Sequence, residues 1–300
     1  MANIKLSIIV VSYNTKKLLY NCLSSIVKSK PNVSYEVIVS DNNSKDKSVL
    51  MVEKNFPQFK LLKNKKNLGF AKGNNRARKI AKGKYILFLN SDTILYKGVL
   101  EKCIEYMEKN PKVGAMSCRV ELKNGSLDPD TRRAFITPWI GFIHIFTGLD
   151  RIFPKSKVFG RYWYGYIPDN IEHEVDVIQG AFFLSKKKIL DKVGWFDEDY
   201  FLDGEDVDLC WKIKSQGYKI MYWPKVKILH IKGSSKGKNQ ARKNVPLKER
   251  IKFRTSGINS MELFVKKRLS QRYPKLFILF VLAGVRLLKI VRITKEVLRG

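Results

Sequence analysis

An acidic segment, residues 197–208, holds the densest group of side chains that could do chemistry. Seven of its twelve residues are Asp or Glu, in a chain whose 58 Lys and Arg outnumber its 27 Asp and Glu. The dipole of a following helix favours negative charge in its first turn, but capping accounts for one or two of the seven. A carboxylate held in a cleft can remove a proton from a hydroxyl group. The segment is therefore a candidate catalytic site.

Two other Asp residues follow strand-like runs. Asp41 comes after Glu36–Val39 and Asp92 comes after Tyr85–Leu89. Asp41 could accept a hydrogen bond from a ring N–H, with Tyr13 stacked on the ring. Asp92 suits a hard divalent cation held against a diphosphate. An ordinary polar turn is the alternative interpretation for both.

Histidine and cysteine are sparse. His230 ends the run Val226–His230, where a structural role is the alternative to a functional one. The four cysteines include no CxxC pair, which argues against a zinc cluster and favours reduced, buried thiols. Because the N-terminal residues also lack a signal-peptide pattern, we expect a cytoplasmic protein.

Strand-like and helix-like patterns alternate through residues 1–120. This alternation, with apolar strands, predicts an α/β fold with a Rossmann-like, mostly parallel sheet and helices on both faces. Ligands of such sheets bind at the carboxyl ends of the strands, where Tyr13, Asp41 and Asp92 fall. The strands are expected at Leu6–Val11, Glu36–Val39, Phe59–Lys63, Tyr85–Leu89 and Val113–Ser117, and the helices at Lys16–Ser29, Gly73–Ala81 and Gly98–Lys109.

Residues 124–174 are rich in aromatic residues, Pro and Gly. A substrate-side lobe and a structural flap on the sheet are equally compatible with that composition. Regular structure is expected to resume afterwards. The strands are expected at Val175–Leu184, Tyr218–Trp223 and Val226–His230, and the helices at Lys187–Val193 and Glu205–Gln216.

The net charge of +31 points to an acidic partner: nucleic acid, an anionic membrane or a phosphate-bearing substrate. Residues 1–120 hold 23 basic and 8 acidic residues, residues 121–230 hold 16 of each, and residues 231–300 hold 19 and 3. The excess therefore flanks a neutral block that contains the acidic segment.

The basic C-terminal region suggests attachment to a surface. Residues 232–254 could be a lid, although a solvated linker is favoured. The apolar run Leu276–Val285 is too short to span a bilayer. Beyond it, basic residues share one half of a helical wheel and apolar residues the other, which is typical of a helix lying on an anionic membrane. Dimerisation, or packing on the rest of the protein, is the alternative.

Several motifs together resemble the family-2 glycosyltransferases, which adopt the GT-A nucleotide-sugar fold, and above all their rhamnosyltransferase-like members. The resemblance covers about residues 4–232, and the order and spacing of its motifs are specific. They are SIIVVSYN (7–14), SDNNSKD (40–46), NLGFAKGNN (67–75), YILFLNSDT (85–93), IQGAFFLSKK (178–187), GWFDEDYFLDGEDVDLCWKIKSQGY (194–218) and ILH (228–230).

The resemblance implies roles on the donor side. Tyr13 and Asp41 would hold the pyrimidine base, and Asn75 and Ser91 would lie near the nucleotide. Without bulky side chains, Gly180 and Ala181 would allow the donor sugar to approach the backbone.

The resemblance also implies a metal and a base. Asp92 would bind Mn²⁺ or Mg²⁺, with Asn90 in place of the first Asp of the family's Asp-x-Asp motif. His230 would then be a supplementary ligand. Asp206 would be the general base, with Glu205 beside it in acceptor binding. One base without a carboxylate nucleophile predicts inversion at the anomeric carbon.

The expected function is thus inverting, metal-dependent transfer of a sugar from dTDP-rhamnose or a UDP-sugar. The acceptor would be a saccharide or lipid-linked saccharide of a cell-surface glycan, with the enzyme peripheral on the inner face of the cell membrane. Residues 1–231 would form the GT-A domain, divided into a nucleotide-binding half (1–120) and an acceptor and catalytic half (121–231). Residues 232–300 would form a basic linker and membrane-associating helices.

Two alternatives belong to other classes. A nucleic-acid-binding protein without catalytic activity would suit the charge, but no recognised module is present, so no nucleic acid is expected. A nucleotidyltransferase of similar topology would need a glycine-rich phosphate loop, which the sequence lacks. The oligomeric state stays open.

Overall fold

The computed structural model describes residues 4–232 and 247–298, so most of the predicted linker lies outside the described residues. A nine-stranded sheet runs in the order β3-β2-β1-β4-β8-β6-β9-β5, with β7 paired to β9. The strands are β1 (Leu6–Ser12), β2 (Tyr35–Asp41), β3 (Lys60–Lys63), β4 (Tyr85–Asn90), β5 (Thr93–Ile94), β6 (Val113–Leu122), β7 (His173–Glu174), β8 (Phe182–Lys186) and β9 (Lys219–His230).

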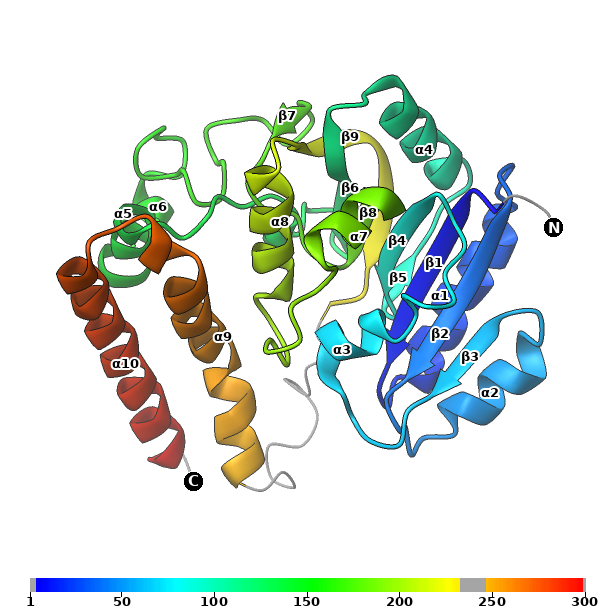
Figure 1. The fold of residues 1–300 in the computed structure, drawn as a ribbon, viewed down its shortest axis with the longest axis horizontal. Helices are drawn as coiled ribbons and strands as arrows, with labels where there is room; N and C mark the ends of the chain where they lie inside the picture. Colours follow the sequence, from blue (N-terminus) through cyan, green and yellow to red (C-terminus); the bar gives the residue numbers. More distant parts are fainter. Residues whose placement is uncertain (1–3, 233–246, 299–300) are drawn as a thin grey trace.

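Helices cover both faces of this sheet, as Figure 1 shows. They are α1 (Lys16–Ser29), α2 (Ser48–Asn55), α3 (Gly69–Asn75), α4 (Val99–Lys109), α5 (Pro138–Gly141), α6 (Leu149–Ile152), α7 (Lys187–Val193), α8 (Glu205–Ser215), α9 (Leu247–Lys267) and α10 (Lys275–Val297), with short turns η1 (Pro129–Thr131), η2 (Phe142–Thr147) and η4 (Leu269–Gln271).

The sheet is mixed. Strands β1 to β4 run parallel, and their register places Ser12 beside Asp41 and Val11 beside Asn90. The carboxyl ends of β1, β2 and β4 therefore meet at one edge. Strand β8 runs antiparallel to both its neighbours, while β6 and β9 are parallel to each other. An apolar run predicts a buried strand but not its direction, so the sequence did not distinguish the two halves.

Alternation along β1 divides the core into two layers. Ile8 and Val10 lie in the cluster that includes residues of α1, α2 and α4. Ile9 lies in the other cluster, with residues of α3, α7, α8 and α9. Because successive side chains of a strand point to opposite faces, one apolar run contributes to both cores.

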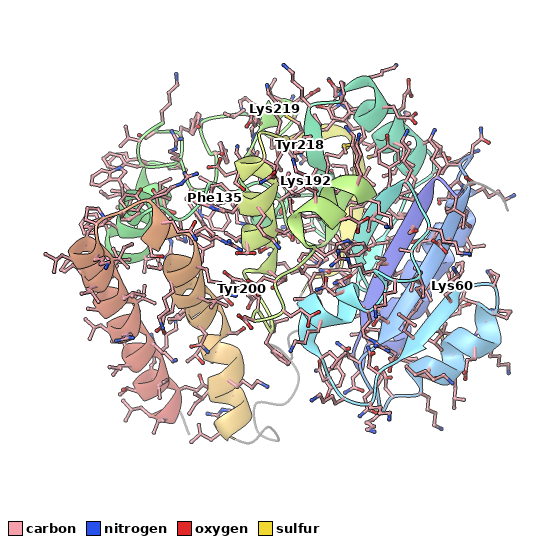
Figure 2. The ribbon with its side chains drawn as sticks, viewed as in Figure 1. Lys60, Phe135, Lys192, Tyr200, Tyr218 and Lys219 are labelled. Carbon is pink, nitrogen blue, oxygen red and sulfur yellow. The ribbon has the colours of Figure 1, made fainter. Side chains whose placement is uncertain are left out.

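Helices α9 and α10 pack against each other at the end of the molecule opposite β2 and β3 (Figure 1). Next to them lie residues 135–166, which we call the aromatic lobe; they include α5, η2 and α6. Phe135 of this lobe lies beside α8, on the side toward α9 (Figure 2), and contacts Trp211 and Phe264. Among the helices described, none has the length and hydropathy needed to cross a bilayer.

Several element boundaries differ from the sequence predictions. The helix expected at Gly73–Ala81 spans Gly69–Asn75, and β8 starts at Phe182 rather than at Val175. The two strands predicted on either side of Pro224 are the single strand β9, whose pairing with β6 shifts register between Trp223 and Lys227. Proline cannot donate to the sheet, so a bulge at this point is the expected consequence. Helices α2 and α9 were not predicted.

Candidate active site

The carboxylate of Asp41 lies at the end of β2 and is 1% exposed. Its Oδ1 accepts a hydrogen bond from the backbone N–H of Ser44 at 2.8 Å, and its Oδ2 has no hydrogen-bond partner among the described residues. A buried acceptor without a donor is costly unless a ligand satisfies it. Tyr13, which follows β1, is 43% exposed. The two residues therefore place a buried acceptor, unpartnered among the described residues, and an accessible ring at the same sheet edge.

A chain of hydroxyl groups links the ends of β1 and β4. Ser12 Oγ lies 3.0 Å from Thr15 Oγ1, which lies 3.2 Å from Ser91 Oγ. All three side chains are buried. Ser91 thus ties the loop that carries Asp92 to the loop after β1, beside the nucleotide site that the motifs predict.

Asp92 and His230 are brought together by strand pairing. The antiparallel pair β5–β9 places Thr93 opposite His230, and His230 Nε2 lies 3.2 Å from Asp92 Oδ1. On the other side of the ring, Nδ1 lies 2.8 Å from Asp128 Oδ2. Both carboxylates and the ring are buried. This is the carboxylate–histidine arrangement that fixes the tautomer of a metal-binding imidazole.

The charges around His230 determine its protonation. Burial alone would lower the pKa of His230. The hydrogen bonds that the ring makes with Asp128 and Asp92, and the negative charges of these two carboxylates, outweigh burial and raise this pKa to about 9. Asp128, buried but bonded to His230 and Lys232, has its pKa well below the usual range. Without a metal, an imidazolium therefore joins the two carboxylates.

Asp128 was not predicted from the sequence. It lies in the turn after β6, where its backbone N–H donates to Val120 O at 2.8 Å and Lys232 Nζ binds its Oδ1 at 2.7 Å. A lone Asp at the start of an irregular region has no local signal. The long pairing of β6 with β9, which aligns Leu122 with His230, creates the contact.

Asp206 lies in the first turn of α8 and forms an ion pair with Arg133. Its Oδ2 accepts from Arg133 Nη2 at 2.6 Å, and its Oδ1 accepts from the backbone N–H of Val207 at 2.8 Å. The two side chains are 10% and 14% exposed. Arg133 was also missed from the sequence, because nothing in residues 124–174 indicated which side chains face α8.

The other predicted residues are less open than expected. The amide group of Asn75 bonds Phe196 and Glu198, so it holds the loop before α8. A Cβ built on Gly180 would lie 2.9 Å from the Phe70 ring, so here the missing side chain makes room for Phe70. Ala181 is buried and its carbonyl accepts from Asn90. Glu205 is buried beside Asp206 at the start of α8.

Much of the acidic segment holds the C-terminal helices. Lys267 binds both Asp197 and Asp199 at 2.6 Å, and Arg268 binds Asp208 with two hydrogen bonds of 2.7 and 3.1 Å. Three of the seven acids therefore have a structural role, and the catalytic role predicted for Asp206, with Glu205 beside it, stays a prediction.

The sequence is similar to those of known glycosyltransferases. The sequence model described as "Glycosyl transferase family 2" matches residues 7–194. An N-acetylglucosaminyl-diphospho-decaprenol L-rhamnosyltransferase of Mycobacterium tuberculosis is 25% identical over 252 residues, which are 79% of each chain. A poly-beta-1,6-N-acetyl-D-glucosamine synthase of Staphylococcus epidermidis is 26% identical over 230 residues, 73% of this chain. The chain spans 48% of that synthase's length and 27% of another curated relative.

The fold is shared with solved glycosyltransferases. A mannosyltransferase of Pyrobaculum calidifontis, solved with GDP-Man and Mn²⁺, superposes with a TM-score of 0.58 at 18% identity, over 99% of this chain and 74% of its own. The GT-A fold class is thereby confirmed. Since the family model covers more than half of the chain, the protein belongs to glycosyl transferase family 2. The nucleic-acid-binding and nucleotidyltransferase alternatives have no support in these comparisons.

Proposed function

We propose that the protein transfers a sugar from a nucleoside diphosphate sugar to a saccharide acceptor, in the synthesis of a cell-surface glycan. The buried, unpartnered Oδ2 of Asp41 carries this proposal. It matches the N3–H that uracil and thymine both present, so a UDP-sugar and dTDP-rhamnose are both compatible. The rhamnosyltransferase and the polysaccharide synthase among the relatives support the same class of reaction.

The pair Asp92 and His230 fits a divalent cation. No group of three or more His, Cys, Asp or Glu side chains forms a metal cage in the part of the chain that is described. The two residues would therefore hold the ion together with oxygen atoms of the donor diphosphate. Nδ1 is engaged by Asp128, which leaves Nε2 for the metal, and a metal would bind Nε2 only in its deprotonated form. When bound, the cation would neutralise charge that develops on the leaving diphosphate.

Asp206 is the proposed general base. It would take the proton of the acceptor hydroxyl while that oxygen attacks the anomeric carbon and the bond to the diphosphate breaks. A single displacement of this kind inverts the anomeric configuration. Glu205, adjacent in the first turn of α8, would help to hold the acceptor.

The decisive experiment separates binding from transfer. A screen of UDP- and dTDP-sugars with Mn²⁺ or Mg²⁺ should identify one donor by release of nucleoside diphosphate.

Asp206→Asn should lower kcat at least a hundredfold while nucleotide binding, measured by calorimetry, stays unchanged. Asp41→Ala should weaken nucleotide binding at least tenfold. Unchanged turnover of Asp206→Asn, or release from no donor by the wild type, would refute the proposal.

The metal site has its own test. Asp92→Asn should abolish the strengthening of nucleotide binding by Mn²⁺, because the cation loses its charged oxygen ligand. Glu53→Gln, an exposed acid on α2, is the matched control and should behave as wild type. Full wild-type turnover in excess chelator would contradict a metal role.

We further propose that the enzyme works at an anionic membrane surface. Exposed apolar side chains recur along α10 at helical spacing. Beside them lie three exposed aromatic rings of the aromatic lobe, which stack in sequence: Trp139, Phe142 and Phe146. Phe146 packs near Gly284 of α10, so the two groups adjoin. We call this set the apolar face: Trp139, Phe142, Phe146, Leu276, Phe280 and Leu287, all at least half exposed.

Charge and composition support a lipid partner for the apolar face. An exposed apolar patch flanked by cations suits an interface with anionic lipid, and aromatic rings are favoured at the headgroup level. The flanking cations include Lys275, Arg286 and Lys295 of α10.

A further inference from the structure

A pocket lies along α8 beyond the proposed base, between the aromatic lobe and the turn that joins α9 to α10. Its volume of about 660 Å³ is typical of a small-molecule site. Trp211, which lines it, is five residues beyond Asp206, a rise of ~7.5 Å along the helix. Phe135, two residues from Arg133, lines it as well. The lining residue Trp211 therefore lies more than one helical turn along α8 from the proposed base, and none of the proposed catalytic residues lines the pocket.

The pocket is strongly basic. Four cations line it, against one carboxylate, Asp176. Lys214 forms ion pairs with Asp176 and Glu174 at 3.1 and 2.8 Å. The other three cations have no ion pair with a carboxylate in the described residues; they are Lys157, Arg161 and Arg272. Three uncompensated cations in one pocket favour an anionic ligand.

One of these cations is held in a defined orientation. The Arg272 guanidinium lies over the Trp211 ring at 4.1 Å from its centre. A stacked guanidinium keeps its N–H groups in one plane and presents them at its edge, which is the geometry that binds phosphate oxygens in pairs. The site is thus suited to phosphate rather than to an isolated carboxyl group on a flexible chain.

The mouth of the pocket meets the apolar face. Trp139 belongs to both, and its ring stacks with Phe142, whose ring stacks with Phe146. On the other side, Tyr273 lines the pocket and contacts Phe277 at the start of α10. A soluble phosphate compound has no apolar chain that could contact the apolar face. A lipid could bind its phosphate in the pocket and place its chain on that face.

We infer that this pocket binds the diphosphate head group of a membrane lipid that carries the acceptor sugar. The inference rests on the proposed function and specifies its acceptor. A diphosphate that is esterified at both ends carries two negative charges, whereas a phosphodiester carries one. The three cations therefore complement the diphosphate better. The separation from Asp206 leaves room for the sugar to reach the base while the lipid stays at the membrane surface.

The test uses the full chain and farnesyl diphosphate as a soluble probe. Calorimetry is done in chelator with saturating UDP, so that the donor site cannot take the probe. We expect binding that weakens at least tenfold in Arg161→Gln/Arg272→Gln. Lys28→Gln, which changes an exposed residue of α1 far from the pocket, should bind as wild type.

Two further probes identify the source of the phosphate. Farnesol should bind at least tenfold more weakly than farnesyl diphosphate, and so should inorganic diphosphate. Equal binding of farnesol would overturn the phosphate site, and equal binding of inorganic diphosphate would overturn the lipid. Absence of probe binding to a chain that binds UDP would overturn this inference alone, whereas failure to bind UDP in the presence of Mn²⁺ would count against the proposed function.

Discussion

At the scale of single residues, the ion pair of Asp206 with Arg133 is the least expected feature. Both oxygens of the proposed base already accept hydrogen bonds, one from the guanidinium and one from the α8 backbone. Burial by itself would lower the pKa of Arg133, but the charge of the Asp206 carboxylate and of its other neighbours outweighs burial and raises this pKa well above its usual value. We therefore propose that Arg133 positions the Asp206 carboxylate.

We expect Arg133→Ala to lower kcat at least tenfold with little change in KM for the donor, because the carboxylate loses its fixed orientation. In the Asp206→Asn background, Arg133→Ala should lower kcat little further, because the effects of substituting residues that act as a unit are not additive. Arg133→Lys should recover part of the rate. Steady-state kinetics of the four combinations measures this, and strictly additive losses would contradict the positioning role.

At the scale of elements, the acidic segment is also the docking site for α9. Gly204, with φ of +86°, lets α9 approach, because a Cβ there would lie 2.7 Å from the Ser260 Cβ. The segment therefore positions the start of α8 through contacts with a helix sixty residues further along the chain.

Removing one docking contact should loosen α9. Arg268→Ala leaves Asp208 buried without its main partner, with only Lys212 at 3.8 Å. We expect a loss of about 3 kcal/mol in the free energy of unfolding, at the low end of the range for broken buried pairs. Lys266→Ala, in the last turn of α9 and paired with Glu262 four residues earlier, should cost about 0–1 kcal/mol. Urea denaturation measures both, and equal losses would contradict a structural role for Asp208.

At the scale of the whole molecule, the net charge and the apolar face point to the same partner. Several cations of the described residues 247–298 form ion pairs within the protein. Lys267 and Arg268 bind the acidic segment, and Arg250 and Arg254 bind Glu296 between α9 and α10. Other cations of α10, such as Lys275 and Lys295, are exposed and flank the apolar face. The alternative that the C-terminal helix packs on the protein is thus correct for one side of α10, while its other side stays exposed.

Vesicle binding tests the exposed side. Leu276→Asp/Phe280→Asp should reduce sedimentation with vesicles containing anionic phospholipid at least tenfold, because both side chains are more than three-quarters exposed and would enter the lipid. Leu50→Asp, an exposed leucine on α2, is the matched control. Binding by the wild type should fall with salt. Unchanged sedimentation of the double variant would contradict a membrane role for α10.

The helices and strands could be predicted from sequence patterns better than the contacts between distant side chains could. Buried strands such as Tyr85–Leu89 are readable because continuous apolar runs suit a sheet covered on both faces. The pairing of His230 with Asp128 is not readable, because it joins residues about a hundred positions apart through β6 and β9. Helix α9 was missed because its mixed polar and apolar face becomes a core surface only against α8.

The amino-acid sequence by itself determined the α/β architecture and the positions of Tyr13, Asp41 and Asp92 after their strands, because local periodicity and motif order carry that information. Only the tertiary structure decided which side chains face them. Strand pairing brought His230 to Asp92, and the packing of the aromatic lobe brought Arg133 to Asp206. Helix docking gave three of the seven acids, Asp197, Asp199 and Asp208, a structural role, because the energy of a buried charge depends on partners that no local pattern identifies.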